Sequence, residues 1–235
     1  MHAFLARRPV TRIENEEGTA LVVDAGAAAT CITNCRDCRI TLTGRATKLV
    51  IGWPAHLTPS FATCFTDDTT FAPNPAEGCR DCTLTLSKPV TTGTAEVINC
   101  QSVTVHLNHH IPTIQADGCT GCELVLRDRR GFHALYTAKT TQMVVTLPNG
   151  EADGQVQRYE LDYSDGELEL DQFITRFVED NAPPLTERVI REGAGYPTTV
   201  REKEINDARE RQLEEALVNF LDSELFPNPA PTPNR

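Results

Sequence analysis

Hydrophobic and polar residues follow one short pattern that recurs through the first two thirds of the chain. Each copy has a first position, a second position three residues later, and apolar residues at alternate positions after that. Its copies are Cys35/Cys38/Ile40/Leu42, Cys79/Cys82/Leu84/Leu86, Cys100/Val103/Val105/Leu107, Cys119/Cys122/Leu124/Leu126 and Thr140/Met143/Val145/Leu147. Period-two alternation predicts strands with one face on a core. Between copies runs a second extended segment, Ile111 to Ala116, in which Pro112 predicts a sheet edge or a strand start.

The copies recur with a period near 20 residues, which predicts a β-solenoid in which each unit is one coil. Successive first positions are 19 to 21 residues apart, except for the 44 residues between Cys35 and Cys79. Because 44 is about two units, we expect one degenerate coil near Trp53 to Glu77. The solenoid then has about six coils.

The pattern changes after residue 150. Val156 to Tyr163 and Glu167 to Val178 are two extended runs joined by Ser164-Asp165-Gly166, and an Asp-Gly step is a hairpin signal. An isolated two-stranded hairpin is marginal in water. We therefore expect this hairpin to dimerise the chain through the apolar residues that alternate with charges, which are Tyr159, Leu161, Leu168 and Leu170.

The last residues read as a charged helix and a tail. Ile205, Leu213, Ala216, Leu217, Phe220 and Leu221 form one apolar stripe at helical spacing. The proline-rich end, FPNPAPTPNR, has nothing to bury. The expected organisation is therefore a β-helix over residues 11–150, a dimerisation hairpin over 151–180, a linker over 181–200, an acidic amphipathic helix over 201–226 and a disordered tail over 227–235.

Charge and hydropathy narrow the classes of partner. The net charge of −11 lies entirely in residues 151–235, which hold 20 acidic and 9 basic side chains. No basic surface is left over to neutralise phosphates, which argues against nucleic acid as a partner. No apolar run approaches the ~20 residues of a membrane span, and the start does not read as a signal peptide. Nine cysteines, an odd number, favour a reducing, cytoplasmic location.

Three Cys-x-x-Cys pairs would ordinarily indicate zinc. The repeat argues otherwise, because the equivalent second positions hold Val103 and Met143 and one first position holds Thr140. Valine cannot replace a metal ligand, whereas cysteine can replace a small core residue. We therefore expect no metal and no cofactor, with zinc between stacked pairs as the alternative.

Neither the histidines nor the sequence motifs indicate a metal site or a known catalytic site. His106, His109 and His110 cluster at one coil edge without carboxylates at ligand spacing, so a polar outer ladder is expected. The chain has no nucleophile elbow, P-loop or Rossmann fingerprint. Composition and spacing alone lead to a β-solenoid with an acidic C-terminal third.

Four short motifs extend this reading by resemblance. They are Arg12-Ile13-Glu14-Asn15, the corner Asn34-Cys35, Ile111-Pro112-Thr113-Ile114 followed by Asp117-Gly118-Cys119, and the run from Ala138 to Pro148. In this order they resemble the C-terminal domain of the cyclase-associated proteins, which are actin regulators. This resemblance covers about residues 11–150.

The resemblance implies a right-handed parallel β-helix, a homodimer through a swapped C-terminal hairpin, binding of ADP-actin with promotion of nucleotide exchange, and a cytoskeletal location. A coil surface rather than a pocket would recognise actin. Polar, outward residues that meet this description are Lys139, Thr141 and Gln142 at the final coil, with Pro112 and Thr113 one coil earlier. The chain is expected to be non-enzymatic.

Two alternatives stay open. Tubulin cofactor C and its relatives share the β-helix and activate GTP hydrolysis with an arginine at a coil start. Here the corresponding stretch, His109 to Ile114, contains no arginine, although Arg127, Arg129 and Arg130 lie in a nearby loop. The other alternative is a structural cytoskeletal protein that uses the β-helix as a docking body.

Overall fold

The computed structural model describes residues 9–52, 78–148, 156–179, 182–192 and 196–225. The chain divides into two compact units, residues 1–188 and 189–235, which are described separately below.

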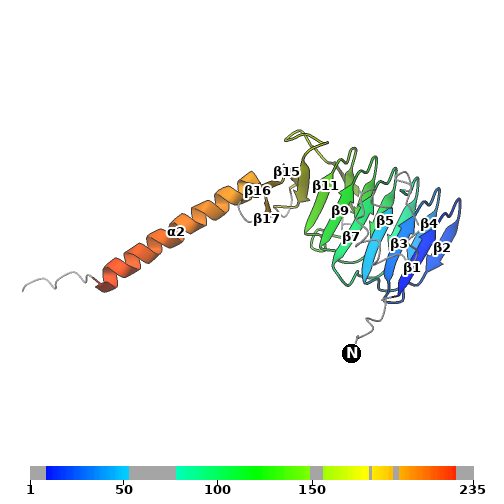
Figure 1. The fold of residues 1–235 in the computed structure, drawn as a ribbon, viewed down its shortest axis with the longest axis horizontal. Helices are drawn as coiled ribbons and strands as arrows, with labels where there is room; N and C mark the ends of the chain where they lie inside the picture. The colour runs from blue at the N-terminus through cyan, green and yellow to red at the C-terminus, as the bar shows by residue number, and fades with distance from the viewer. Residues whose placement is uncertain (1–8, 53–77, 149–155, 180–181, 193–195, 226–235) are drawn as a thin grey trace, which may run out of the picture. The chain divides into compact units, whose positions relative to one another are not determined.

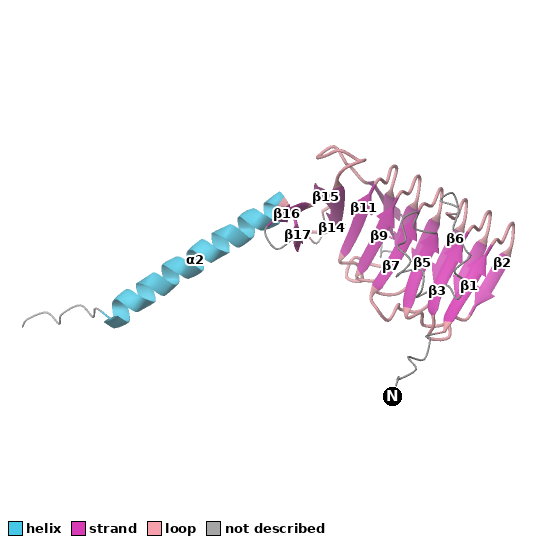
Figure 2. Ribbon diagram, in the orientation of Figure 1, coloured by secondary structure: helices cyan, strands magenta, loops and turns pink. Residues whose placement is uncertain are grey.

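The first unit is a parallel β-helix of six coils, each made of two strands (Figure 1). The first strands of the coils are β1 (Val10–Glu14), β3 (Ala29–Thr33), β5 (Lys48–Gly52), β7 (Thr94–Ile98), β9 (Thr113–Asp117) and β11 (Ala134–Ala138). The second strands are β2 (Ala20–Val23), β4 (Arg39–Leu42), β6 (Thr83–Leu86), β8 (Thr104–Leu107), β10 (Glu123–Leu126) and β12 (Val144–Pro148). Like strands of successive coils pair in parallel, so odd strands stack in one sheet and even strands in another (Figure 2).

The core is built from the alternation that the sequence displays. The apolar residues at alternate positions of the even strands, such as Leu84, Val105 and Leu124, are almost completely buried. Their neighbours on the odd strands, Ile51 and Ile114, face the same interior cluster. In-register stacking repeats these buried positions from the second coil onward, so the predicted parallel β-helix fold is confirmed.

The predicted count of about six coils is confirmed, but the degenerate coil predicted near Trp53 to Glu77 is wrong. Leu42 of β4 pairs directly with Leu86 of β6, and Ile32 of β3 with Ile51 of β5. No degenerate coil therefore lies between the coils of Cys35 and Cys79. The extra length between them is an insertion between β5 and β6, and most of it lies outside the described residues.

The strands that follow β12 extend both sheets. Strand β13 (Val156–Glu160) pairs antiparallel with β12, while β14 (Gln172–Arg176) pairs antiparallel with β11 and with β15 (Leu185–Arg188). The prediction that the runs at 156–163 and 167–178 pair with each other as a hairpin is wrong. Each run finds its partner on the last coil, whose edges would otherwise leave backbone groups unpaired.

The second unit contains the antiparallel hairpin and the C-terminal helix. Strands β16 (Ile190–Glu192) and β17 (Tyr196–Thr198) pair with each other. Helix α2 (Val200–Leu225) is capped at its N-terminus by Thr199, whose hydroxyl accepts a hydrogen bond from the Glu202 backbone N–H at 3.2 Å. The proline-rich tail lies outside the described residues. Within the described part of the chain, no helix is long and apolar enough to cross a membrane.

Candidate partner-binding surface

The turn between the two strands of each coil forms a third parallel ladder. The residue after each first position bridges to its equivalent in the next coil, in the order Glu17, Arg36, Arg80, Gln101, Thr120 and Thr141. We call these six residues the corner ladder. All but the half-buried Thr141 are exposed. Neighbouring positions are one strand spacing apart, about 4.8 Å, so the corner ladder is a regular polar surface along the β-helix.

Left-handed backbone conformations fix the shape of this surface. Two columns of residues with positive φ flank the corner ladder: one contains Asn34, Asn99 and Lys139, and the other contains Asp81 and Gln142. Few residues other than glycine adopt this conformation readily, apart from asparagine and aspartate. Lys139 (φ 50°) and Gln142 (φ 53°) are therefore presented on a backbone held by the repeat.

Hydrogen bonds from the first positions hold the corners together. The Cys100 thiol donates to the Ile98 carbonyl at 3.3 Å, and the Cys119 thiol donates to the Val97 carbonyl at 3.4 Å. In the last coil the Thr140 hydroxyl lies 2.9 Å from the Ala116 carbonyl oxygen and accepts from the Cys119 backbone N–H at 3.3 Å. Cysteine and threonine share this position because both carry a compact hydrogen-bond donor on a small side chain.

Packing accounts for the second positions. Cys82 and Cys122 are buried there, as are Val103 and Met143, which cannot donate a hydrogen bond. Burial raises the pKa of the Cys82 thiol to about 11, so this thiol is protonated at neutral pH. Across the described residues, no group of three or more His, Cys, Asp or Glu side chains could hold a metal ion.

The structure brings together three of the five residues predicted to contact a partner. Lys139 and Gln142 are exposed on either side of the last position of the corner ladder, Thr141. The Thr141 hydroxyl donates to the Thr120 hydroxyl at 3.3 Å, which links the last two coils. These residues share one corner of the β-helix.

Pro112 and Thr113 lie elsewhere. Thr113 begins β9 and pairs with Ala134, whereas Lys139 follows the end of β11. At about 3.3 Å per residue, the length of the strand separates the two groups by roughly 15 Å. The five residues therefore form two surfaces at opposite ends of the strands. Pro112 directly precedes β9, which confirms the predicted strand start.

The four residues predicted for dimerisation are divided between the chain's own core and solvent. Tyr159 and Leu161 pack against the interior cluster of their own chain. The Leu168 carbonyl accepts a hydrogen bond from the Lys139 backbone N–H at 3.2 Å. Leu170, in contrast, is 79% exposed.

The arginines of the corner ladder were not among the predicted contact residues. Arg36 and Arg80 are exposed and stand on adjacent coils. The signal that could have identified them is their place in the repeat, one residue after the first position of each copy. A regular polar position in that register points away from the core in every coil.

Comparison with known proteins agrees with this architecture. The first unit is a parallel β-helix whose corners carry hydrogen-bond donors. Antiparallel strands after β12, the closing strands β13, β14 and β15, extend its two sheets. The family described as "Adenylate cyclase associated (CAP) C terminal" matches residues 76–166. Cyclase-associated protein 1 of Arabidopsis thaliana is 31% identical over 80 residues, which make up 32% of this chain and 17% of that protein.

A solved structure extends the likeness of the fold. The crystal structure of cyclase-associated protein from Cryptosporidium parvum is similar with a TM-score of 0.51 over 76% of this chain and 90% of that chain. At 14% identity, this comparison shows the fold alone. Together the findings confirm the resemblance to the C-terminal domain of the cyclase-associated proteins, which residues 76–166 carry in sequence.

Proposed function

We propose that this protein is a cytoplasmic regulator of the actin cytoskeleton that binds actin monomers in their ADP form and promotes nucleotide exchange. The observation that carries the proposal is the match of residues 76–166 to the family of cyclase-associated C-terminal domains. Because the matched part is 17% of the Arabidopsis relative, activities of the whole relative are part of the proposal.

The corner ladder supports recognition of a protein surface. Its residues are held in register by backbone bridges over six coils, so little backbone conformational entropy is lost when a partner docks. Lys139 offers an exposed ammonium group at the last coil, where it can pair with an acidic group of actin. Charges at the rim of an interface chiefly affect association rate and specificity.

The test is the double variant Lys139→Glu with Gln142→Ala. We expect it to weaken ADP-actin binding at least about tenfold, or ~1.4 kcal/mol, with thermal stability unchanged because both side chains are exposed. Arg45→Glu, an exposed charge reversal in a loop between coils, is the matched control. A Thr113→Glu variant tests the other end of the strands separately.

The outcomes separate the candidate functions. Weaker binding by the double variant alone places the contact beside the last position of the corner ladder, and weaker binding by Thr113→Glu alone moves it to the start of β9. No binding of actin by the unmodified protein refutes the proposal. Parallel pull-downs of tubulin, with a GTPase assay, then test activation of GTP hydrolysis against a docking role.

We further propose that the protein forms a homodimer through its closing strands. Strands β13 and β15 end the two sheets and leave one edge each without a described partner strand. Leu170 adds an exposed apolar side chain nearby in sequence. Light scattering should give the mass of two chains, and Leu170→Glu should lower it toward one. A single-chain mass for the unmodified protein contradicts this proposal.

A further inference from the structure

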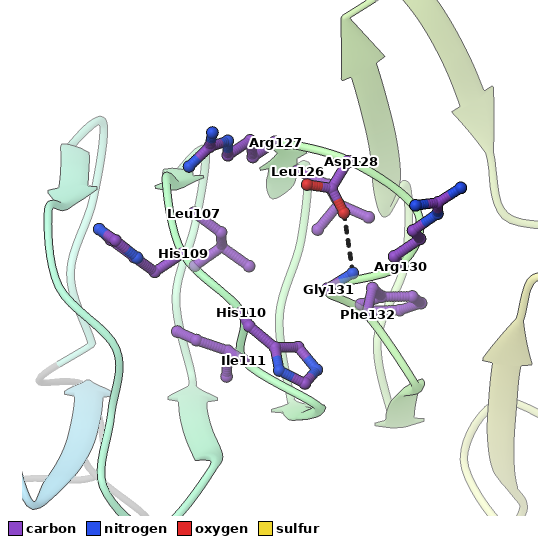
Figure 3. A pocket seen from close by; sticks show the side chains of 10 residues that line it. All are labelled: Leu107, His109, His110, Ile111, Leu126, Arg127, Asp128, Arg130, Gly131 and Phe132. Atoms are coloured by element: carbon purple, nitrogen blue, oxygen red, sulfur yellow. Dashed lines mark hydrogen bonds between the residues drawn. The ribbon is translucent and has the colours of Figure 1, made fainter.

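The two loops that join coils four, five and six line a solvent-open cavity of about 340 Å³ (Figure 3). Its base is formed by Leu107, Ile111, Leu126 and Phe132, all of which are buried. This size falls within the range of about 300–1,000 Å³ found for small-molecule sites, which also combine an apolar lining with a few polar groups. The cavity lies at the opposite end of the strands from the corner ladder.

The rim of the cavity is cationic. Arg127, Arg130, His109 and His110 line it, and the only carboxylate among its lining residues is that of Asp128. The Asp128 side chain accepts a hydrogen bond from the Gly131 backbone N–H at 2.9 Å, which holds the loop in its turn. In Figure 3 the side chains of Arg127 and Arg130 extend in opposite directions from this loop.

A third arginine anchors the loop and leaves its two neighbours available. Arg129 donates to the Tyr159 hydroxyl at 3.0 Å and to the Ala182 carbonyl at 2.6 Å, and its guanidinium lies 4.7 Å from the centre of the Phe177 ring. The guanidinium groups of Arg127 and Arg130, in contrast, have no hydrogen-bond or carboxylate partner within the described ranges. The loop is thus fixed while two strong donors remain open to a ligand.

We propose that this cavity binds a small organic phosphate that carries a flat aromatic ring, as a nucleotide does. A guanidinium matches the geometry of phosphate oxygens and binds them with two parallel hydrogen bonds. The apolar base has no donor to offer a phosphate, but it fits the face of a ring. The two imidazoles supply additional donors beside the arginines. The site goes beyond the proposed binding of actin and uses none of its residues.

Calorimetry on the full chain, without actin or magnesium, tests the proposal with three probes: ADP, adenosine and pyrophosphate. Adenosine carries the ring alone and pyrophosphate carries the charge alone. We expect ADP to bind with a Kd below about 1 mM and each fragment to bind at least about tenfold more weakly, because both halves of the cavity contribute.

Charge reversal locates the site. Arg127→Glu with Arg130→Glu should weaken ADP at least about tenfold, while Arg45→Glu, in the loop after β4, should leave affinity within about twofold. All three side chains are exposed, and unchanged melting temperatures check that the variants fold. No ADP binding up to about 5 mM overturns the proposal. Pyrophosphate binding as tight as that of ADP also overturns the proposal, because the apolar base of the cavity then plays no part. So does an effect of Arg45→Glu as large as that of the double variant, because Arg127 and Arg130 then play no particular part.

Discussion

Substitution by valine should lower the free energy of unfolding more at a first position of the repeat than at a second position. Thr140→Val is the sharpest test. The Thr140 side chain is 1% exposed, and its hydroxyl accepts a hydrogen bond from the Cys119 backbone N–H. Valine has the same shape but removes the oxygen. It therefore leaves that buried N–H and the Ala116 carbonyl without the hydroxyl.

The size of the effect follows from these contacts. An unsatisfied buried polar group costs about 1–3 kcal/mol, and the added methyl group of valine returns up to about 0.8 kcal/mol. We expect Thr140→Val to lower the free energy of unfolding by about 2 kcal/mol. The matched change at a second position is Cys122→Val, which should cost less than about 1 kcal/mol. Valine already occupies that position in the preceding coil, and the hydrogen bonds of the Cys122 thiol to carbonyls are long, 3.6 and 3.7 Å.

Equilibrium urea unfolding followed by circular dichroism measures both changes, provided that the m-values agree with that of the unmodified protein. Thr140→Ser is a further control, because it keeps the oxygen and removes only a methyl group. The reasoning is refuted if Thr140→Val lies within about 0.5 kcal/mol of the unmodified protein, or if Cys122→Val is equally costly.

Three further predictions follow from burial and charge. The eight described cysteines are buried and free, so in a native thiol titration at neutral pH they should stay unreactive until denaturant is added. The ninth cysteine, Cys64, lies outside the described residues, so one reactive thiol per chain is compatible with this prediction. Rapid reaction of more than one thiol per chain would contradict it. Burial raises the pKa of the Asp117 carboxyl group, so ionisation of this group destabilises the fold. Asp117→Asn should therefore be no more stable than the unmodified protein near pH 3 but increasingly more stable as the pH rises to 7. Urea midpoints that show no such trend refute this prediction. Arg129→Ala should lower the free energy of unfolding by about 1–3 kcal/mol because the contacts of Arg129 with the closing strands are lost. Arg127→Ala should change the free energy of unfolding by less than about 0.5 kcal/mol. Equal urea midpoints for the two variants would argue against an anchoring role for Arg129.

Local pattern was sufficient to predict the β-helix. Alternation at Leu84 and Leu86 determines which face of a strand is buried, and the same spacing in each copy makes the buried positions stack. The occupants of the second position, Val103 and Met143, were enough to favour packing over metal binding. The prediction of the β-helix succeeds because it depends on contacts that successive coils repeat.

Pairing between segments far apart in sequence was decided by tertiary structure. The Asp165-Gly166 step and two alternating runs are compatible with a local hairpin, yet both runs pair with the last coil. The open edges of that coil carry rows of backbone donors and acceptors, which stabilise any strand that reaches them. Likewise, a 44-residue interval can hold an extra coil or an insertion, and only the register of Leu42 with Leu86 distinguishes them.

The candidate surfaces show the same division. Sequence alone identified Lys139, Thr141 and Gln142 as outward residues, because their place in the repeat determines their direction. It could not show that Pro112 and Thr113 lie at the opposite end of the strands, or that Arg127 and Arg130 line one cavity with residues of the preceding loop. Periodicity determines which way a side chain points, whereas the stacking of coils determines which side chains become neighbours.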